Sequence, residues 1–128
     1  YRWQVEYSRA ELTEIICAKC GLDFDHLIGL QPVSRGKSGR LVYLKIITDR
    51  GDFVIGKELR IRLALSKSCL FSSAIWFEWV EDQCIIHGKG WGHGVGMCQL
   101  GATRMAFEGN DYRSILNYYY PATEIQNY

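Results

Sequence analysis

The stretch GKGWGHGVGMCQLGATRMA, residues 88–106, decides how this sequence is interpreted. Glycine occupies every second position at its start, at Gly88, Gly90, Gly92, Gly94 and Gly96. If the segment is a strand, all five glycines leave the same face bare. Each then costs stability, because glycine has no side chain to pack and much backbone freedom to lose. Good helix formers follow, so the segment leads into a helix.

Two explanations of this glycine segment are compatible with each other. In the first, the glycines are structural: another element packs against the bare face, or turns require a positive φ. In the second, a ligand approaches the backbone while the intervening side chains point toward it. The pattern is neither a dinucleotide fingerprint nor a P-loop, because no G-x-G-x-x-G opens a βαβ unit and no Gly-Lys-Ser/Thr follows.

The part of the chain before the glycine segment alternates short strands with two helices. Residues 1–7 read as a strand with Trp3, Val5 and Tyr7 on one face. Ser8 and Glu11 have the spacing of a helix-opening capping box, and Gly21 is placed to end that helix. Further strands are expected at residues 27–34, 41–48 (with Val42, Leu44 and Ile46 on one face) and 53–55. A short helix at 56–66 uses Leu59, Leu63 and Leu65, and a hairpin joins 75–80 to 83–87.

Two helices are expected after the glycine segment, at residues 97–107 and 112–118. Gly109 stops the first helix, and Asp111 caps the second, which ends before Pro121. The fold class is therefore α+β: antiparallel strands and hairpins with a few short helices, and a glycine-rich loop leading into a C-terminal helix pair.

Composition limits the function classes. The chain has 128 residues, of which 48% are apolar and 23% charged, so we expect one domain, or a fragment of one, that is long enough to bury a real core. Fifteen basic against fourteen acidic side chains give a formal charge of +1, which argues against a nucleic-acid partner. No apolar run approaches the roughly 18 residues of a membrane span.

The cysteines and histidines do not form a convincing metal-binding pattern. The five cysteines are an odd number, which argues against a fully paired disulfide framework and leaves their redox state open. Cys17 and Cys20 have a C-x-x-C spacing, but structural zinc sites usually bring two such pairs. His87, His93 and Cys98 are close in sequence without that spacing. We therefore expect no metal and no cofactor.

Several polar and aromatic residues are candidates for ligand binding. His93 lies between two glycines and so has little local cover for its ring nitrogens. Gln99 carries an amide that can donate and accept, and Trp91 could offer its flat face to a sugar ring or pack in the core. Arg40 belongs to a basic turn that could hold a glycan hydroxyl or a carboxylate, or could simply keep a hairpin soluble. Tyr119 lies in a run of three tyrosines, of which at least one must pack inward.

The glycine segment resembles the C-terminal signature of the SpoIID/LytB family. The resemblance rests on G-x-G-W-G-H-G-V-G-M-x-Q-x-G-A at residues 88–102, then A-x-x-G at 106–109, Y-x-x-I-L at 112–116 and Y-Y-P at 119–121. S-G-R at 38–40, a Leu-Arg pair and S-x-x-F at 68–71 resemble earlier blocks of the family. The glycine-histidine block is highly specific, and the match runs over nearly the whole chain.

The resemblance implies action on bacterial peptidoglycan. Sporulation protein D of this family is a lytic transglycosylase that cleaves glycan strands whose stem peptides have been removed. One carboxylic acid protonates the leaving oxygen, the muramyl C6 hydroxyl closes onto C1, and the carboxylate takes the hydroxyl proton. The resemblance also implies an extracytoplasmic location, in the periplasm or cell envelope.

The family's catalytic glutamate belongs to an alanine-rich helix in the N-terminal half, and nothing here matches that helix. Residues 1–128 are therefore expected to be the C-terminal portion of a SpoIID-like domain, with the half that carries the acid absent, or a divergent member. Glu6, Glu58, Glu78 and Glu108 lie in or beside apolar runs, but a solvated carboxylate is the simpler reading of each. Whether the chain is an enzyme stays open.

Two functions follow as hypotheses. In the first, the chain is the glycan-cleft half of a lytic transglycosylase that releases anhydro-muramyl products. His93 and Gln99 then orient the sugar, Trp91 and Tyr119 stack on it, and Ser38 and Arg40 contribute from further away. In the second, it is a non-catalytic enhancer or binding module that stimulates an N-acetylmuramoyl-L-alanine amidase. The expected partners are glycan strands and an amidase or another cell-wall hydrolase.

Overall fold

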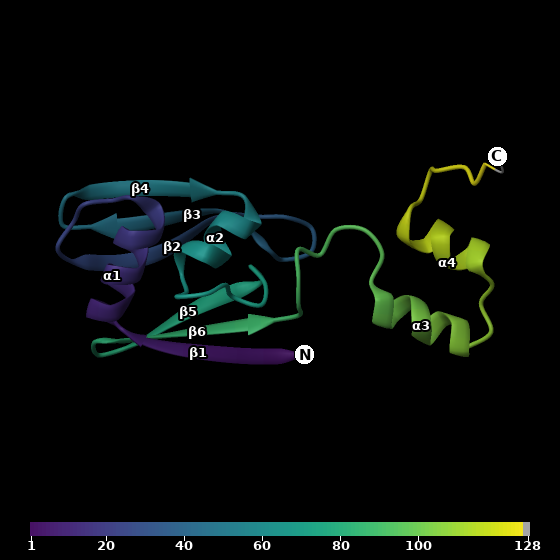
Figure 1. Cartoon of the computed structure of the whole chain (residues 1–128), viewed down its shortest axis with the longest axis horizontal. Helices are drawn as coiled ribbons and strands as arrows, with labels where there is room; N and C mark the ends of the chain where they lie inside the picture. Colours follow the sequence, from purple (N-terminus) through teal and green to yellow (C-terminus); the bar gives the residue numbers. More distant parts are fainter. Residues whose placement is uncertain (127–128) are drawn as a thin grey trace. The chain divides into compact units, whose positions relative to one another are not determined.

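The computed structural model describes residues 1–126 and confirms the predicted order of strands and helices (Figure 1). The chain divides into two compact units, with the boundary between His93 and Gly94. Each unit is described by itself. The fold class is α+β, as the sequence predicts.

The first unit contains two antiparallel three-stranded sheets. One sheet has the order β1-β6-β5, and the other has the order β2-β3-β4 (Figure 1). Their strands are β1 (Arg2–Ser8), β2 (Leu27–Arg35), β3 (Leu41–Thr48), β4 (Gly51–Gly56), β5 (Ile75–Val80) and β6 (Gln83–Lys89). Helices α1 (Arg9–Cys20) and α2 (Glu58–Ala64) complete the unit.

Helix α1 begins and ends where its local sequence requires. The Ser8 hydroxyl accepts a hydrogen bond from the Glu11 backbone N–H, and the Glu11 carboxylate accepts one from the Ser8 backbone, which forms the predicted capping box. These bonds to Ser8 lower the pKa of Glu11. Gly21 ends the helix in the left-handed conformation, with φ of 65°.

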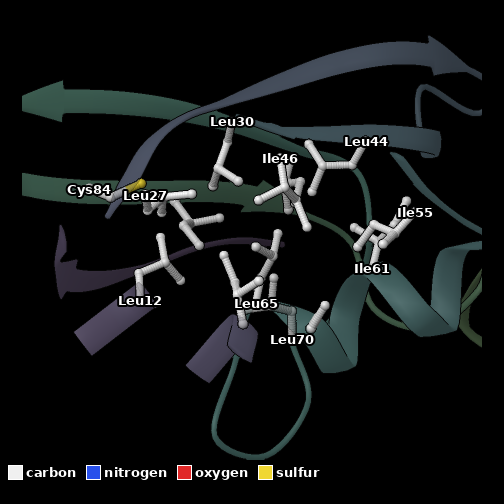
Figure 2. Packing of buried hydrophobic residues seen from close by; sticks show 14 of the residues in the cluster. Leu12, Leu27, Leu30, Leu44, Ile46, Ile55, Ile61, Leu65, Leu70 and Cys84 are labelled. Carbon is white, nitrogen blue, oxygen red and sulfur yellow. The ribbon is translucent and has the colours of Figure 1, made fainter. Parts of the chain in front are cut away.

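One hydrophobic core joins both sheets and both helices of the first unit. Its buried side chains come from α1, α2 and strands β2 to β6. Figure 2 shows side chains of this core pointing toward one another, with Leu12, Leu44, Ile61 and Cys84 among the labelled ones. Each of these four side chains is completely buried. The burial of these apolar side chains, which come from distant parts of the sequence, holds the two sheets together, and no single helix or strand does so.

The structure corrects the predicted apolar face of α2. Leu59 and Leu63 are exposed, whereas Ile61, Ala64 and Leu65 are buried. The helix has only seven residues and packs against β3 and α1, so these neighbours choose its inward face. The predicted face of β3 is also wrong at one end, where Val42 is exposed.

The glycine segment is a loop and not a strand beyond its first two residues. Strand β6 ends at Lys89, and the next four glycines, Gly90, Gly92, Gly94 and Gly96, have φ of 73°, 76°, 69° and 78°. Left-handed backbone at every second position is accessible to glycine and strained for other residues. The predicted bare strand face is therefore wrong, and the alternative that turns require positive φ is confirmed.

The second unit contains the predicted helix pair, α3 (Gln99–Phe107) and α4 (Tyr112–Tyr119). Helix α3 begins two residues later than expected, because Cys98 is still extended and caps the helix through its sulfur. The Asp111 carboxylate caps α4 by accepting from the Ser114 backbone N–H at 2.8 Å, and this bond lowers the pKa of Asp111. Gly109 follows α3 with φ of 91°, as its predicted role as a stop requires.

Across residues 1–126, no helix combines the length and the apolar character that crossing a bilayer demands.

Gly88 supports a first prediction, because a Cβ at this position would overlap the indole ring of Trp3. We expect Gly88→Ala to lower the free energy of unfolding by roughly 1–3 kcal/mol, as overpacking a filled site does. All four tryptophans lie within residues 1–93, so their fluorescence during urea unfolding measures the first unit.

Gly36→Ala is the matched control. A Cβ at Gly36 would make only an ordinary contact at 3.8 Å with Val42. Its stability should be unchanged or higher by up to about 1 kcal/mol, since alanine restricts the unfolded chain. Equal destabilisation by both substitutions would contradict the close contact between Trp3 and Gly88.

Candidate functional site

The first glycines of the loop are fixed by hydrogen bonds to strand β1. The Trp3 indole N–H donates to the carbonyl of Gly90 at 3.1 Å, and the Gly90 N–H donates to the carbonyl of Tyr1 at 2.8 Å. The same indole lies against Gly88, where only a hydrogen on Cα leaves room for it. The start of the loop is thus held to β1 by packing and by hydrogen bonds.

Two further segments hold the loop at Gly92. Its N–H donates to the carbonyl of Phe71 at 2.7 Å, and its carbonyl accepts from the Arg40 Nε at 3.2 Å. The Ser72 hydroxyl donates to the carbonyl of Lys89 at 2.7 Å. The S-G-R turn, the S-x-x-F segment and the glycine loop are far apart in sequence and meet here.

A cationic groove of ≈ 360 Å³ lies at this meeting point. It is lined by Tyr1, Arg2, Arg40, Ala74, Lys89 and Gly90. Among these described lining residues three are cationic and none carries a carboxylate. The groove is therefore suited to a negatively charged group or to an oxygen that accepts hydrogen bonds.

The turn that supplies Arg40 is held in place by a second arginine. The Arg35 guanidinium donates to the carbonyl of Gly39 at 2.8 Å and to that of Ile75 at 2.7 Å. These bonds join the turn after β2 to strand β5 of the other sheet. Ser38 lies at the exposed tip of the same turn.

An aromatic cluster lies beside this groove. The ring centroid of Trp91 lies 4.7 Å from that of Phe71 and 5.8 Å from that of Tyr1, and Phe71 also contacts Trp3 at 5.4 Å. Trp91 nevertheless remains 65% exposed. Its indole is fixed in position and still offers most of its surface to solvent, so the core-packing alternative for Trp91 is wrong.

The structure thus brings Arg40 and Trp91 to one place on the first unit. His93 is exposed and follows Trp91 by two residues in the same loop. Lys89, Arg2 and the role of Phe71 were missed by the sequence analysis. The position of Lys89 between two glycines could have indicated that it belongs to the groove. Nothing in the sequence around Arg2 indicated this.

The other two predicted site residues, Gln99 and Tyr119, belong to the second unit. Gln99 is the exposed first residue of α3. Tyr119 on α4 is half-buried with its hydroxyl against Gly101, where a Cβ would collide with it. Burial, and after it the neighbouring Cys98 and Tyr118, raise the pKa of Tyr119.

Side chains of the second unit bind backbone N–H groups at the start of α3. In the structure the Met97 N–H donates to the Tyr120 hydroxyl at 3.2 Å, and the Gly101 N–H donates to the Cys98 sulfur at 3.4 Å. Two backbone donors of this helix start are therefore already bound by side chains of the same unit.

The four glutamates in or beside apolar runs all have polar partners. Glu58 pairs with Arg62, Glu108 pairs with Arg104, and Glu6 accepts from Gln4. Glu78 contacts His87 at 2.7 Å. Glu6, Glu78 and Glu108 are exposed, Glu58 is half-buried beside Arg62, and none of the four lines the cationic groove.

The cysteines differ widely in exposure. Cys84 is completely buried, Cys98 is exposed, and Cys17, Cys20 and Cys69 are intermediate. Burial raises the pKa of the Cys84 thiol to about 11, although the charge of Arg9 acts in the opposite direction. In the described part of the chain, residues 1–126, no three His, Cys, Asp or Glu side chains gather in a metal-binding group.

The fold and the groove define an α+β domain in which hydrogen bonds to segments distant in sequence hold a glycine-histidine loop in place. A family model described as a domain of unknown function (DUF8618) matches residues 1–96. Stage II sporulation protein D of Bacillus subtilis is 32% identical over 109 residues, and the Amidase enhancer of the same organism is 54% identical over 43 residues. The chain therefore belongs to the SpoIID-like proteins and, through residues 1–96, to the DUF8618 family.

The chain spans only part of these relatives. An uncharacterized protein of Brachyspira hyodysenteriae is 40% identical over 92 residues, which are 72% of this chain and 24% of that protein. The match to Stage II sporulation protein D covers 84% of this chain and 29% of the relative. For the Amidase enhancer the two fractions are 34% and 6%.

The exposure of the thiols supports a second prediction. At pH 8.5, Cys98 should react first with an alkylating reagent and Cys84 only when the first unit unfolds. A thiol with a pKa of about 11 is well under about 1% ionised at that pH, and the thiolate is the reactive form. Peptide mass spectrometry after timed alkylation measures the order.

Cys98→Ser is the control, since it should remove the fast-reacting thiol and leave the others unchanged. Alkylation of Cys84 in the native protein at the rate of Cys98 would contradict the burial of Cys84.

Proposed function

We propose that this chain acts on the bacterial cell wall as the glycan-binding half of a SpoIID-like lytic transglycosylase. The substrate class is peptide-free glycan strands, and the products are anhydro-muramyl sugars. In this proposal residues 1–128 are the C-terminal portion of the domain, and the catalytic acid comes from outside them. The place of action is extracytoplasmic.

The observation that carries the proposal is the cationic groove beside the exposed indole of Trp91. A muramyl residue without its stem peptide has a free carboxylate, which Arg40 and Lys89 match in charge. The flat apolar face of an indole suits the apolar face of a pyranose ring. Because Phe71 and the pinned loop hold Trp91 in place, little rotamer entropy is lost on binding.

His93, two residues beyond Trp91 in the exposed loop, has the role of orienting the sugar near the incoming acid. An imidazole can donate and accept hydrogen bonds, so it can fix a hydroxyl without itself transferring the leaving-group proton. For the second unit, taken by itself, Gln99 and Tyr119 are proposed as contacts to glycan. Ser38 is proposed as a contact at the tip of the arginine turn.

Lys89 provides the test of charge recognition. We expect Lys89→Gln to lower the affinity for peptide-free glycan strands about tenfold, equivalent to about 1.4 kcal/mol. It should leave unchanged the affinity for chitin oligosaccharides, which lack the muramyl carboxylate. Isothermal titration calorimetry with both ligands measures the difference.

Lys19→Gln is the matched control, because Lys19 is an exposed lysine of α1 that does not line the groove. Trp91→Ala should weaken both ligands, since the stacking face is common to them. Equal affinity of wild type and Lys89→Gln for the muramyl strands would remove the groove from the proposal.

His93 provides the test of catalysis in the complete protein. With peptide-free strands as substrate, His93→Ala should lower kcat/KM for release of anhydro-muramyl products by a factor of at least about 10, which a lost positioning contact can cost. His26→Ala, at an exposed position before β2 and outside the loop, is the control. Undiminished product release would exclude His93 from the mechanism.

A second function is favoured by one observation, the 54% identity to the Amidase enhancer over 43 residues. In that case the chain binds glycan and stimulates a partner N-acetylmuramoyl-L-alanine amidase without cleaving the strand. The complete protein would then release no anhydro-muramyl products alone and would raise the rate of the amidase.

A further inference from the structure

A second groove lies on the solvent-facing side of the β1-β6-β5 sheet. Its volume is ≈ 330 Å³, and it is lined by Arg2, Trp3, Gln4, Trp76, His87 and Gly88. Gln4, His87 and Trp76 are direct cross-strand partners in the three strands, so their side chains project from the same face.

The aromatic part of this second groove is fixed before any ligand arrives. The Trp76 and His87 rings stack with centroids 5.4 Å apart and an interplanar angle of 15°. His87 Nε2 is held by the Glu78 carboxylate at 2.7 Å. Trp76 still remains 42% exposed. A held and exposed indole beside polar side chains is typical of a binding contact.

The second groove shares a lining residue with the cationic groove. Arg2 lines both of them. Lys89, in the cationic groove, is the cross-strand partner of Arg2 and lies two residues from His87 on β6, which is about 7 Å along a strand. One oligosaccharide can therefore cover both grooves at once.

We infer that the second groove is an additional subsite for the same glycan strand, with Trp76 as its stacking platform. This inference rests on the proposed function. Arg2 and Gln4 supply hydrogen-bond donors for sugar hydroxyls and carboxylates, and Trp76 supplies the apolar face. Around the groove the same sheet face carries the exposed side chains Glu6, Glu78, Gln83 and Val80. Three of these four are polar, which suits a sugar better than an apolar protein partner.

The consequence is that affinity depends on strand length. A short oligosaccharide fills the cationic groove alone, whereas a longer one gains the contact with Trp76. Two linked contacts on one ligand strengthen binding, because the second one is made intramolecularly.

The test titrates the full chain with peptide-free glycan oligosaccharides of increasing length. Wild-type affinity should rise with length. Trp76→Ala should bind the shortest oligosaccharide as wild type does and lose at least about fivefold affinity for the longest, the loss expected of an aromatic binding residue. Arg2→Gln, which affects both grooves, should weaken every length.

Val80→Ala is the matched control, since Val80 is exposed on the same strand and the same face, four residues from Trp76. If Trp76→Ala fails to fold, as judged by its thermal unfolding, Gln4→Ala probes the same groove through an exposed side chain and should show the same loss for long strands.

The outcomes separate the two proposals. If wild type binds no oligosaccharide of any length, the proposed function falls and this inference falls with it. If wild type binds and the affinity of Trp76→Ala rises with oligosaccharide length as that of wild type does, only the additional subsite is overturned. Equal weakening at all lengths by Trp76→Ala would also overturn it, since Trp76 would then not belong to a separate subsite.

Discussion

The contact between the Trp3 indole and the backbone at Gly88 and Gly90 is the constraint on which the proposed binding surface depends. The ring occupies the space where a Cβ of residue 88 would lie, and its N–H binds the carbonyl of Gly90. This contact joins β1 to the end of β6, two segments that are 87 positions apart at the hydrogen bond. The direction in which the glycine loop leaves the sheet follows from it.

From this point the loop is built by alternation. Every second residue from Gly90 to Gly96 is a glycine in the left-handed conformation, which other residues adopt only with strain. Trp91 and His93 lie between these glycines. Hydrogen bonds from Arg40 and to Phe71 then fix Gly92. The loop thus combines an unusual backbone with several anchors, a combination suited to presenting side chains rather than burying them.

The two grooves of the first unit share a design. Each places an exposed tryptophan, held by another ring, beside cationic or amide side chains, and Arg2 lines both. In the proposed function the sheet β1-β6-β5 supports the binding surface, and it also forms a wall of the core. In the second unit a glycine also makes room for an aromatic side chain, because the hydroxyl of Tyr119 lies where a Cβ of residue 101 would be.

The order of elements, the caps at Ser8, Gly21 and Asp111 and the need for glycine after residue 88 were all determined by the sequence itself. These features depend on residues within a few positions of one another, so local patterns express them. Only the tertiary structure decided the inward face of α2 and the assembly of the cationic groove. A helix of seven residues carries too little periodicity to choose a face, and Arg2, Arg40 and Lys89 become neighbours only when strands from distant parts of the chain pair.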